Sequence, residues 1–106
     1  MTALLGVWDA TLQSPLGPIE IVLEFTDQDG SLRGTSTASG ETVGLSALTV
    51  HRGDDGSARA TWSADVTKPV AVHLDFDLTI ASGTMSGTAR AGMLMPEGPV
   101  SGVKRA

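Results

Sequence analysis

The pentapeptide HLDFD, which begins at His73, holds three of the residues in this chain that could do chemistry. On a β-strand, His73, Asp75 and Asp77 share one face, with successive members roughly 6.5–7 Å apart. Such a face can present ligands to a metal ion, or let a carboxylate orient the imidazole as a general base. The alternating residues Leu74 and Phe76 are apolar, however. We therefore expect the polar face to point to solvent, with no metal bound.

Two other acids, Asp65 and Glu97, are candidates for proton transfer. Both fall in or beside long loops that the strand pattern places at one end of the fold. Either would need desolvation to raise its pKa into a useful range. The acidic segment Gly53–Gly56 lacks the alternating oxygens and the closing glutamate of an EF-hand calcium loop, so it predicts a turn.

The residue types that are missing exclude several classes of chemistry. The chain has no cysteine and no tyrosine, and only two histidines. Disulfides, zinc–thiolate sites and thiol nucleophiles are therefore excluded. The sequence also has no P-loop, dinucleotide fingerprint or G-x-S-x-G motif. Covalent or redox catalysis would need a borrowed cofactor, and we expect none.

Composition indicates a globular protein that avoids polyanions. The 106 residues are 41% hydrophobic, which predicts one domain over residues 1–106. The net charge of −5, with seven scattered Lys and Arg, argues against nucleic acid or an anionic membrane as partner. The first residues, MTALLGVW, have neither the basic region nor the apolar length of a signal peptide or membrane span. We expect a cytoplasmic location.

The elements that position these residues read as short strands. Thirteen glycines, abundant Thr, Val and Ser, and clear period-2 alternation favour β-structure, and no segment has a helical period. Short turns link the strands as hairpins, and closing the sheet removes its exposed edges. The prediction is an all-β, eight-stranded antiparallel up-and-down β-barrel. Its strands lie near Leu4–Leu12, Ile19–Thr26, Ser31–Thr37, Val43–His51, Ser57–Ala64, Val70–Ile80, Thr84–Ala91 and Val100–Arg105.

The chain also resembles itself. PIEIVLEF, at Pro18–Phe25, aligns with PVAVHLDF, at Pro69–Phe76, and SLRGT then aligns with TMSGT in the same order. Two four-stranded halves would explain this similarity. The general likeness of amphipathic hairpins would explain it equally well.

The start of the first strand carries a family signature. Gly6-Val7-Trp8 resembles the G-x-W motif of the lipocalin-like, or calycin, barrels. The resemblance implies that Trp8 plugs the closed end and that a cation from the last strand, Arg105 or Lys104 in its place, packs across the ring. The chain is shorter than classical lipocalins and lacks their C-terminal helix and cysteines, so it is more similar to minimal bacterial barrels of calycin type.

In an up-and-down meander, alternate turns lie at opposite ends. All five prolines and the longer loops fall at the end away from Trp8, which predicts a ligand mouth or contact surface there. Large inward residues face small ones, which is typical of a shaped cavity and also of a filled core. The candidate ligand-binding residues are Phe25, Trp62, Phe76, Met85, Met93 and Met95.

Three functions fit this reading. The leading one is a lipocalin-like module that binds a small hydrophobic molecule. The second is a cofactor-free isomerase or cyclase acting on a small hydrophobic substrate in the barrel, with Glu97 or Asp65 as its acid or base. Calycin-type barrels that act as cyclases make this resemblance relevant. The third is a filled barrel for protein interaction or homo-oligomerisation. Whether the chain is an enzyme stays open.

Overall fold

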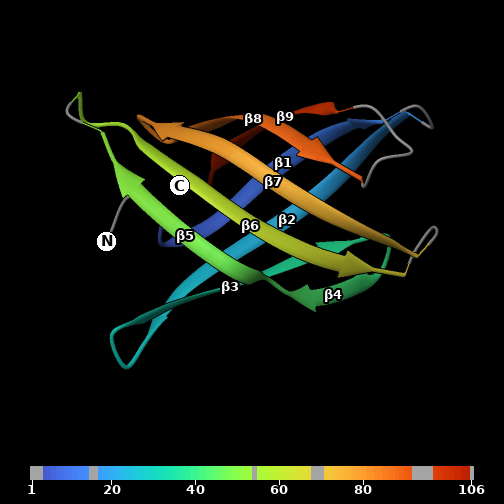
Figure 1. Ribbon diagram of the computed structural model, residues 1–106, viewed down its shortest axis with the longest axis horizontal. Helices are drawn as coiled ribbons and strands as arrows, with labels where there is room; N and C mark the ends of the chain where they lie inside the picture. The colour runs from blue at the N-terminus through green and yellow to red at the C-terminus, as the bar shows by residue number, and fades with distance from the viewer. Residues whose placement is uncertain (1–3, 15–16, 54, 68–70, 92–96, 106) are drawn as a thin grey trace.

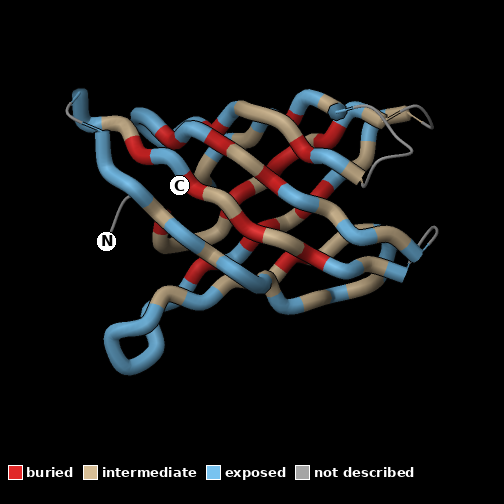
Figure 2. Tube along the Cα trace, viewed as in Figure 1, coloured by how far each residue is buried: buried red, intermediate tan, exposed pale blue. Residues whose placement is uncertain are grey.

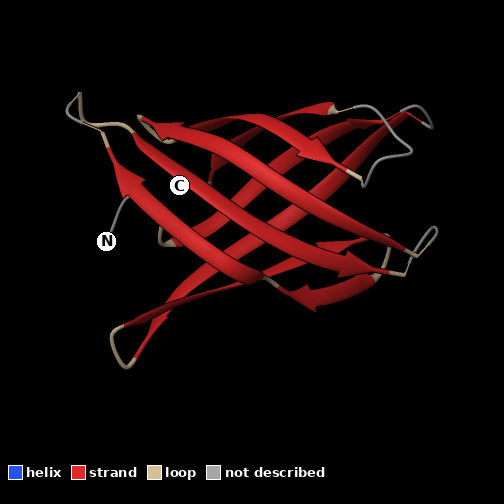
Figure 3. Ribbon diagram, viewed as in Figure 1, coloured by secondary structure: helices blue, strands red, loops and turns tan. Residues whose placement is uncertain are grey.

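A computed structural model of the protein describes residues 4–14, 17–53, 55–67, 71–91 and 97–105. In these segments all regular structure is β-strand, as Figure 3 shows. No helix long and apolar enough to cross a membrane occurs in this part of the chain. The strands are β1 (Gly6–Ser14), β2 (Gly17–Gln28), β3 (Ser31–Ala38), β4 (Glu41–Gly44), β5 (Ser46–Arg52), β6 (Ala58–Val66), β7 (Val72–Ala81), β8 (Thr84–Arg90) and β9 (Gly98–Lys104).

The strands form one antiparallel sheet that rolls into a nearly closed barrel (Figure 1). Their order is β4-β3-β2-β1-β9-β8-β7-β6-β5. Except for β1 and β9, which pair the two ends of the chain, every hydrogen-bonded pair joins strands that are consecutive in sequence. This arrangement confirms the antiparallel up-and-down barrel.

The expected number of eight strands is wrong, because the stretch Val43–His51 forms two strands instead of one. β4 pairs with β3, whereas β5 pairs with β6. Leu45, between them, donates its backbone N–H to the Gly34 carbonyl at 2.9 Å. Just beyond it the β5–β6 register shifts, and Ala47 adopts a positive φ of 53°. The chain therefore bends here, as a β-bulge allows, so that β4 pairs with β3 and β5 pairs with β6.

We call this junction of β4 and β5 the seam, because β4 and β5 are the two edge strands of the sheet. β4 lies against β6 without a hydrogen-bonded ladder in the described residues. Glu41 links the two sides, since its Oε1 accepts the Thr67 N–H at 2.8 Å and its other oxygen accepts the Thr67 hydroxyl. Side-chain contacts, rather than strand pairing, hold this part of the wall.

Alternation along the strands decides which side chains fill the barrel. Figure 2 shows buried positions recurring along the central strands, separated by more exposed ones. β2 buries Ile21, Leu23 and Phe25, while Glu20 and Glu24 are exposed. Side chains of successive strand residues point to opposite faces, so one face forms the core and the other meets solvent.

Candidate functional site

Trp8 lies near the start of β1, at the end of the barrel that the resemblance expects it to plug. Its side chain is fully buried and its Nε1 donates to the Leu4 carbonyl at 2.9 Å. Lys104, not Arg105, covers the ring, with Nζ 5.8 Å from the ring centroid. Arg105 instead forms a two-pronged contact with Asp9, at 2.8 Å and 2.7 Å, and hydrogen bonding to this guanidinium lowers the pKa of Asp9. The plug is thus a satisfied indole under an ammonium group.

Phe25, Trp62 and Phe76, which we call the aromatic triad, meet inside the barrel. The ring centroids of Phe25 and Trp62 are 5.4 Å apart in an edge-to-face arrangement, and those of Trp62 and Phe76 are 5.4 Å apart and stacked. Such geometries are favoured by the ring quadrupoles. Trp62 and Phe76 lie opposite each other on the neighbouring strands β6 and β7, whereas the contact of Phe25 on β2 with Trp62 crosses the interior. The rings therefore fill the barrel at their own level.

Close backbone packing surrounds the triad. A Cβ on Gly34 would lie 2.7 Å from Leu45 Cδ1 and 3.0 Å from the ring of Phe25. Met85, another expected ligand contact, is buried in the same core, and a Cβ on Gly102 would lie 2.9 Å from its Cγ. The expected mouth residues Met93 and Met95 lie outside the described residues. The structure thus places the aromatic triad and Met85 in one core, and the position of the mouth stays a prediction.

The interior changes character beyond the triad, toward the end where β1, β3, β6 and β8 finish, which we call the loop end. Inward positions there include the small residues Ser36, Ala38 and Ala64 beside Ile21 and Leu74. Ser36 is the one polar residue among the buried residues described. This half of the interior is therefore apolar and uncharged, with small side chains facing large ones.

The indole of Trp62 breaks the usual rule for buried polar groups. The residue is 2% exposed, and its Nε1 is the single buried side-chain nitrogen or oxygen without a hydrogen-bond partner in the described segments. Sequence reasoning placed Trp62 in the wall but missed this donor. A signal was present, because the inward neighbours of Trp62 along β6 are Ala60 and Ala64, which have no acceptor.

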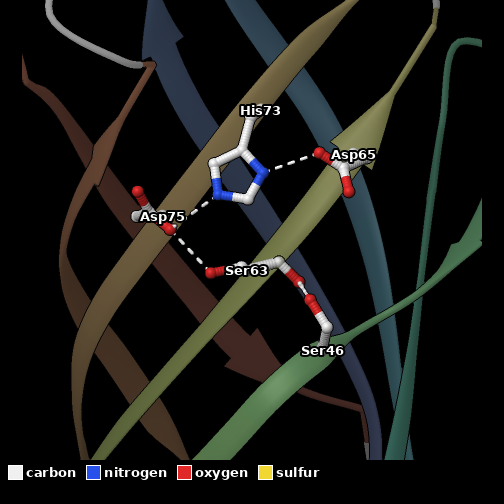
Figure 4. Close-up of polar contacts among 5 residues, drawn as sticks. All are labelled: Ser46, Ser63, Asp65, His73 and Asp75. Atoms are coloured by element: carbon white, nitrogen blue, oxygen red, sulfur yellow. Dashed lines mark hydrogen bonds and ion pairs between the residues drawn. The ribbon is translucent and has the colours of Figure 1, made fainter.

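The outer face of β6 and β7 carries the histidine cluster shown in Figure 4. His73 Nδ1 lies 2.6 Å from Asp65 Oδ1, and its Nε2 lies 3.1 Å from Asp75 Oδ1. Ser63 donates to the same Asp75 oxygen at 2.6 Å, and the Ser46 hydroxyl donates to the Ser63 carbonyl at 3.3 Å. The hydrogen bond to Asp65 raises the pKa of His73 above 6.5.

This geometry does not build a nucleophile–base pair. Both ring nitrogens of His73 face carboxylates, and the Ser63 hydroxyl is directed to Asp75 rather than to the imidazole. The imidazole side chain is 52% exposed, which confirms that this face points to solvent. Among the described residues, no group of acids and histidines is arranged to hold a metal ion. The cluster is best described as a surface clamp across two strands.

The remaining acids considered for chemistry also lie in exposed contacts. Asp77 accepts from Arg59 Nε at 2.8 Å and forms a second contact with the same guanidinium, which lowers the pKa of Asp77. Glu97 pairs with Arg90 at 3.2 Å. The side chain of Asp65 is 80% exposed. Neither Asp65 nor Glu97 is therefore desolvated, as a lumenal acid or base would need to be.

A shallow groove of about 400 Å³ crosses the outer face of β1, β9 and β8. Short hydroxyl side chains line much of it, namely those of Thr11, Thr84, Ser86 and Ser101. Val103, 54% exposed, is the one large hydrophobic residue exposed in the described part of the chain. Such short side chains on an open surface enclose a ligand poorly.

Comparison with known proteins does not show a family for this chain: no family model, curated protein or solved structure matches it.

Proposed function

We propose that the protein binds a small, mainly apolar molecule inside its barrel, on the loop-end side of the aromatic triad. The barrel topology, the Gly6-Val7-Trp8 start and the Lys104 ammonium over the Trp8 ring support a lipocalin-like type. In this proposal the Trp8 plug closes one end, and the ligand enters at the loop end.

One observation carries the proposal: the interior beyond the triad is lined by uncharged side chains, in which small residues face large aliphatic ones. Ala38, Ala64 and Ser36 face the aliphatic side chains of Ile21 and Leu74. Apolar sites with one or two polar groups are typical of small-molecule binding. The rings of the triad would form the floor of such a site.

Energy transfer from tryptophan to N-phenyl-1-naphthylamine, a neutral apolar dye, tests the proposal. We expect saturable transfer at a defined stoichiometry, reversed by a competing apolar compound. Ala64→Leu enlarges a buried inward residue and should weaken dye binding, whereas Ala81→Leu, at an exposed position of β7, should not. A folded protein that shows no transfer at any dye concentration would refute the proposal.

A filled barrel that acts through its surface is the second candidate, and the aromatic triad favours it because its rings occupy the middle of the interior. In that case dye binding is absent and association rises with protein concentration, as sedimentation velocity would detect. Catalysis is not proposed, because Asp65 and Glu97 lie in exposed ion pairs. In the described segments, moreover, no acid or histidine is buried.

A further inference from the structure

We infer that the Trp62 indole N–H anchors the ligand by donating a hydrogen bond to a neutral oxygen acceptor, such as a ketone, ester or ether oxygen. This inference rests on the proposed function, because the acceptor must arrive on a molecule bound in the barrel. Its basis is a buried donor, 2% exposed, with no partner in the described residues. Buried donors are paired in most proteins, since an unpaired one loses its hydration without compensation.

Trp8 shows that this fold can satisfy a buried indole. Both tryptophans are almost completely buried, yet Trp8 donates to the Leu4 carbonyl at 2.9 Å while Trp62 has no acceptor. The difference lies in the surroundings rather than in the residue type. At the plug, Leu4, which lies outside the strands, supplies a carbonyl, whereas Trp62 lies within β6, which pairs with β5 and β7.

The packing around Trp62 explains why the chain itself supplies no acceptor. The ring stacks on Phe76 and meets Phe25 edge to face, so both contacts are hydrocarbon. Along β6 the adjacent inward residues are Ala60 and Ala64. These neighbours fix the position of the ring and leave its one polar group for another molecule.

A trapped water molecule would satisfy this donor poorly. Buried waters typically make about three hydrogen bonds, and apolar cavities stay empty. In the described residues, the other buried residues with a polar side-chain group are Ser36 and Trp8, whose N–H is already paired with the Leu4 carbonyl. An apolar ligand with a single acceptor matches this surface better than water does.

The ligand acceptor should be neutral. In the described part of the chain, no buried residue carries a charge. A carboxylate or phosphate in this interior would lose its hydration without gaining an opposite charge, which is strongly unfavourable. A carbonyl or ether oxygen accepts one hydrogen bond and keeps the rest of the molecule apolar.

Two probes of almost identical shape test the inference: acetophenone, which has a carbonyl oxygen, and α-methylstyrene, which has a CH₂ group in its place. The readout is the pair of indole N–H signals in ¹⁵N-labelled protein, assigned with Trp8→Phe and Trp62→Phe. We expect acetophenone to bind roughly tenfold more tightly. It should move the Trp62 indole proton downfield and leave the Trp8 signal in place. In Trp62→Phe this advantage should be lost, so that acetophenone binds no more tightly than α-methylstyrene.

The outcomes separate the inference from the proposed function. If both probes bind the wild-type protein equally, without a downfield shift at Trp62, the barrel binds ligands and the inference is wrong. If neither the probes nor N-phenyl-1-naphthylamine bind, the proposed function fails and the inference fails with it. The comparison of probes on the wild-type protein decides these cases even where a variant does not fold.

Discussion

Replacing each tryptophan by phenylalanine should affect the stability of the protein in sharply different ways. Trp8→Phe removes the donor from the buried Leu4 carbonyl, which Trp8 Nε1 now contacts at 2.9 Å. Trp62→Phe removes a donor that has no partner. Both substitutions delete a similar volume from the core, because both side chains are at least 98% buried. The volume term therefore nearly cancels in the comparison.

The difference can be estimated from the hydrogen bonds alone. Leaving a buried acceptor unpaired costs about 1–3 kcal/mol, so Trp8→Phe carries this penalty in addition to the lost ring volume. Trp62→Phe relieves a penalty of the same size, which offsets part or all of its own volume loss. The weaker cation–π contact of Lys104 with a phenyl ring adds to the cost at position 8. We expect Trp8→Phe to be less stable than Trp62→Phe by about 3 kcal/mol.

Urea unfolding followed by far-ultraviolet circular dichroism measures this difference without relying on tryptophan fluorescence, which each substitution changes. A gap of this size is a large share of the roughly 5–15 kcal/mol that stabilises a typical domain. The m-values must agree between the two variants for the free energies of unfolding to be compared. Equal destabilisation by the two substitutions would show that the Trp62 N–H has an acceptor in the folded protein, and the reasoning on Trp62 would be refuted.

Two further predictions concern the sheet and its surface. Gly87→Ala should destabilise the fold by about 3 kcal/mol or more in urea unfolding, because the new Cβ would lie 2.0 Å from the Asp77 carbonyl oxygen. The matched control is Gly44→Ala, whose new Cβ would meet nothing within 4 Å. Equal losses of stability in the two variants would contradict the argument. The raised pKa of His73 means that the imidazole binds its proton more tightly in the folded chain than in the unfolded chain. The stability that the contacts of His73 with Asp65 and Asp75 contribute is therefore full below pH 6.5, and it is lost as the pH rises through the pKa of the folded state. In urea unfolding across this range, His73→Gln should remove that decline, and an unchanged slope would argue against the clamp.

The faces of the strands could be predicted from the sequence because they depend on local alternation. Phe25 and Phe76 are buried where the pattern places them, and His73 is exposed. The side-chain period of a strand is two, so a few residues suffice to assign its inner and outer faces. The hairpin turns also follow from local residues, since Gly30 and Gly83 adopt positive φ values of 83° and 75°.

The division into nine strands could not be predicted in the same way. Val43 and Leu45 alternate with a small residue, and the alternation changes phase before Leu48 and Val50. Nothing in that pattern says that the first part pairs with β3 and the second with β6. The choice depends on which strands the closed sheet brings to the junction, and that is set by strand tilt and shear over the whole barrel.

The contacts inside the barrel also depend on tilt and shear. Alternation predicts that Phe25 and Trp62 point inward, but it does not predict that their rings meet across the interior. On the outer face, the partner of His73 follows from register, because Asp65 lies directly opposite it on β6. The sequence shows Asp75 on the same strand face, yet it cannot show that a second carboxylate occupies the neighbouring strand at that level.

The contrast between the two tryptophans supports the proposed ligand site. A core selected only for stability would place phenylalanine or leucine at position 62, because either fills space without an unpaired donor. Trp62 instead keeps a buried N–H without an acceptor in the described residues. Departures from such packing rules are expected at functional sites, where a bound molecule completes what the chain leaves open. Trp8 obeys these rules, because its N–H is paired with the Leu4 carbonyl. The search for a ligand should therefore begin at Trp62, whose N–H has no partner in the described residues.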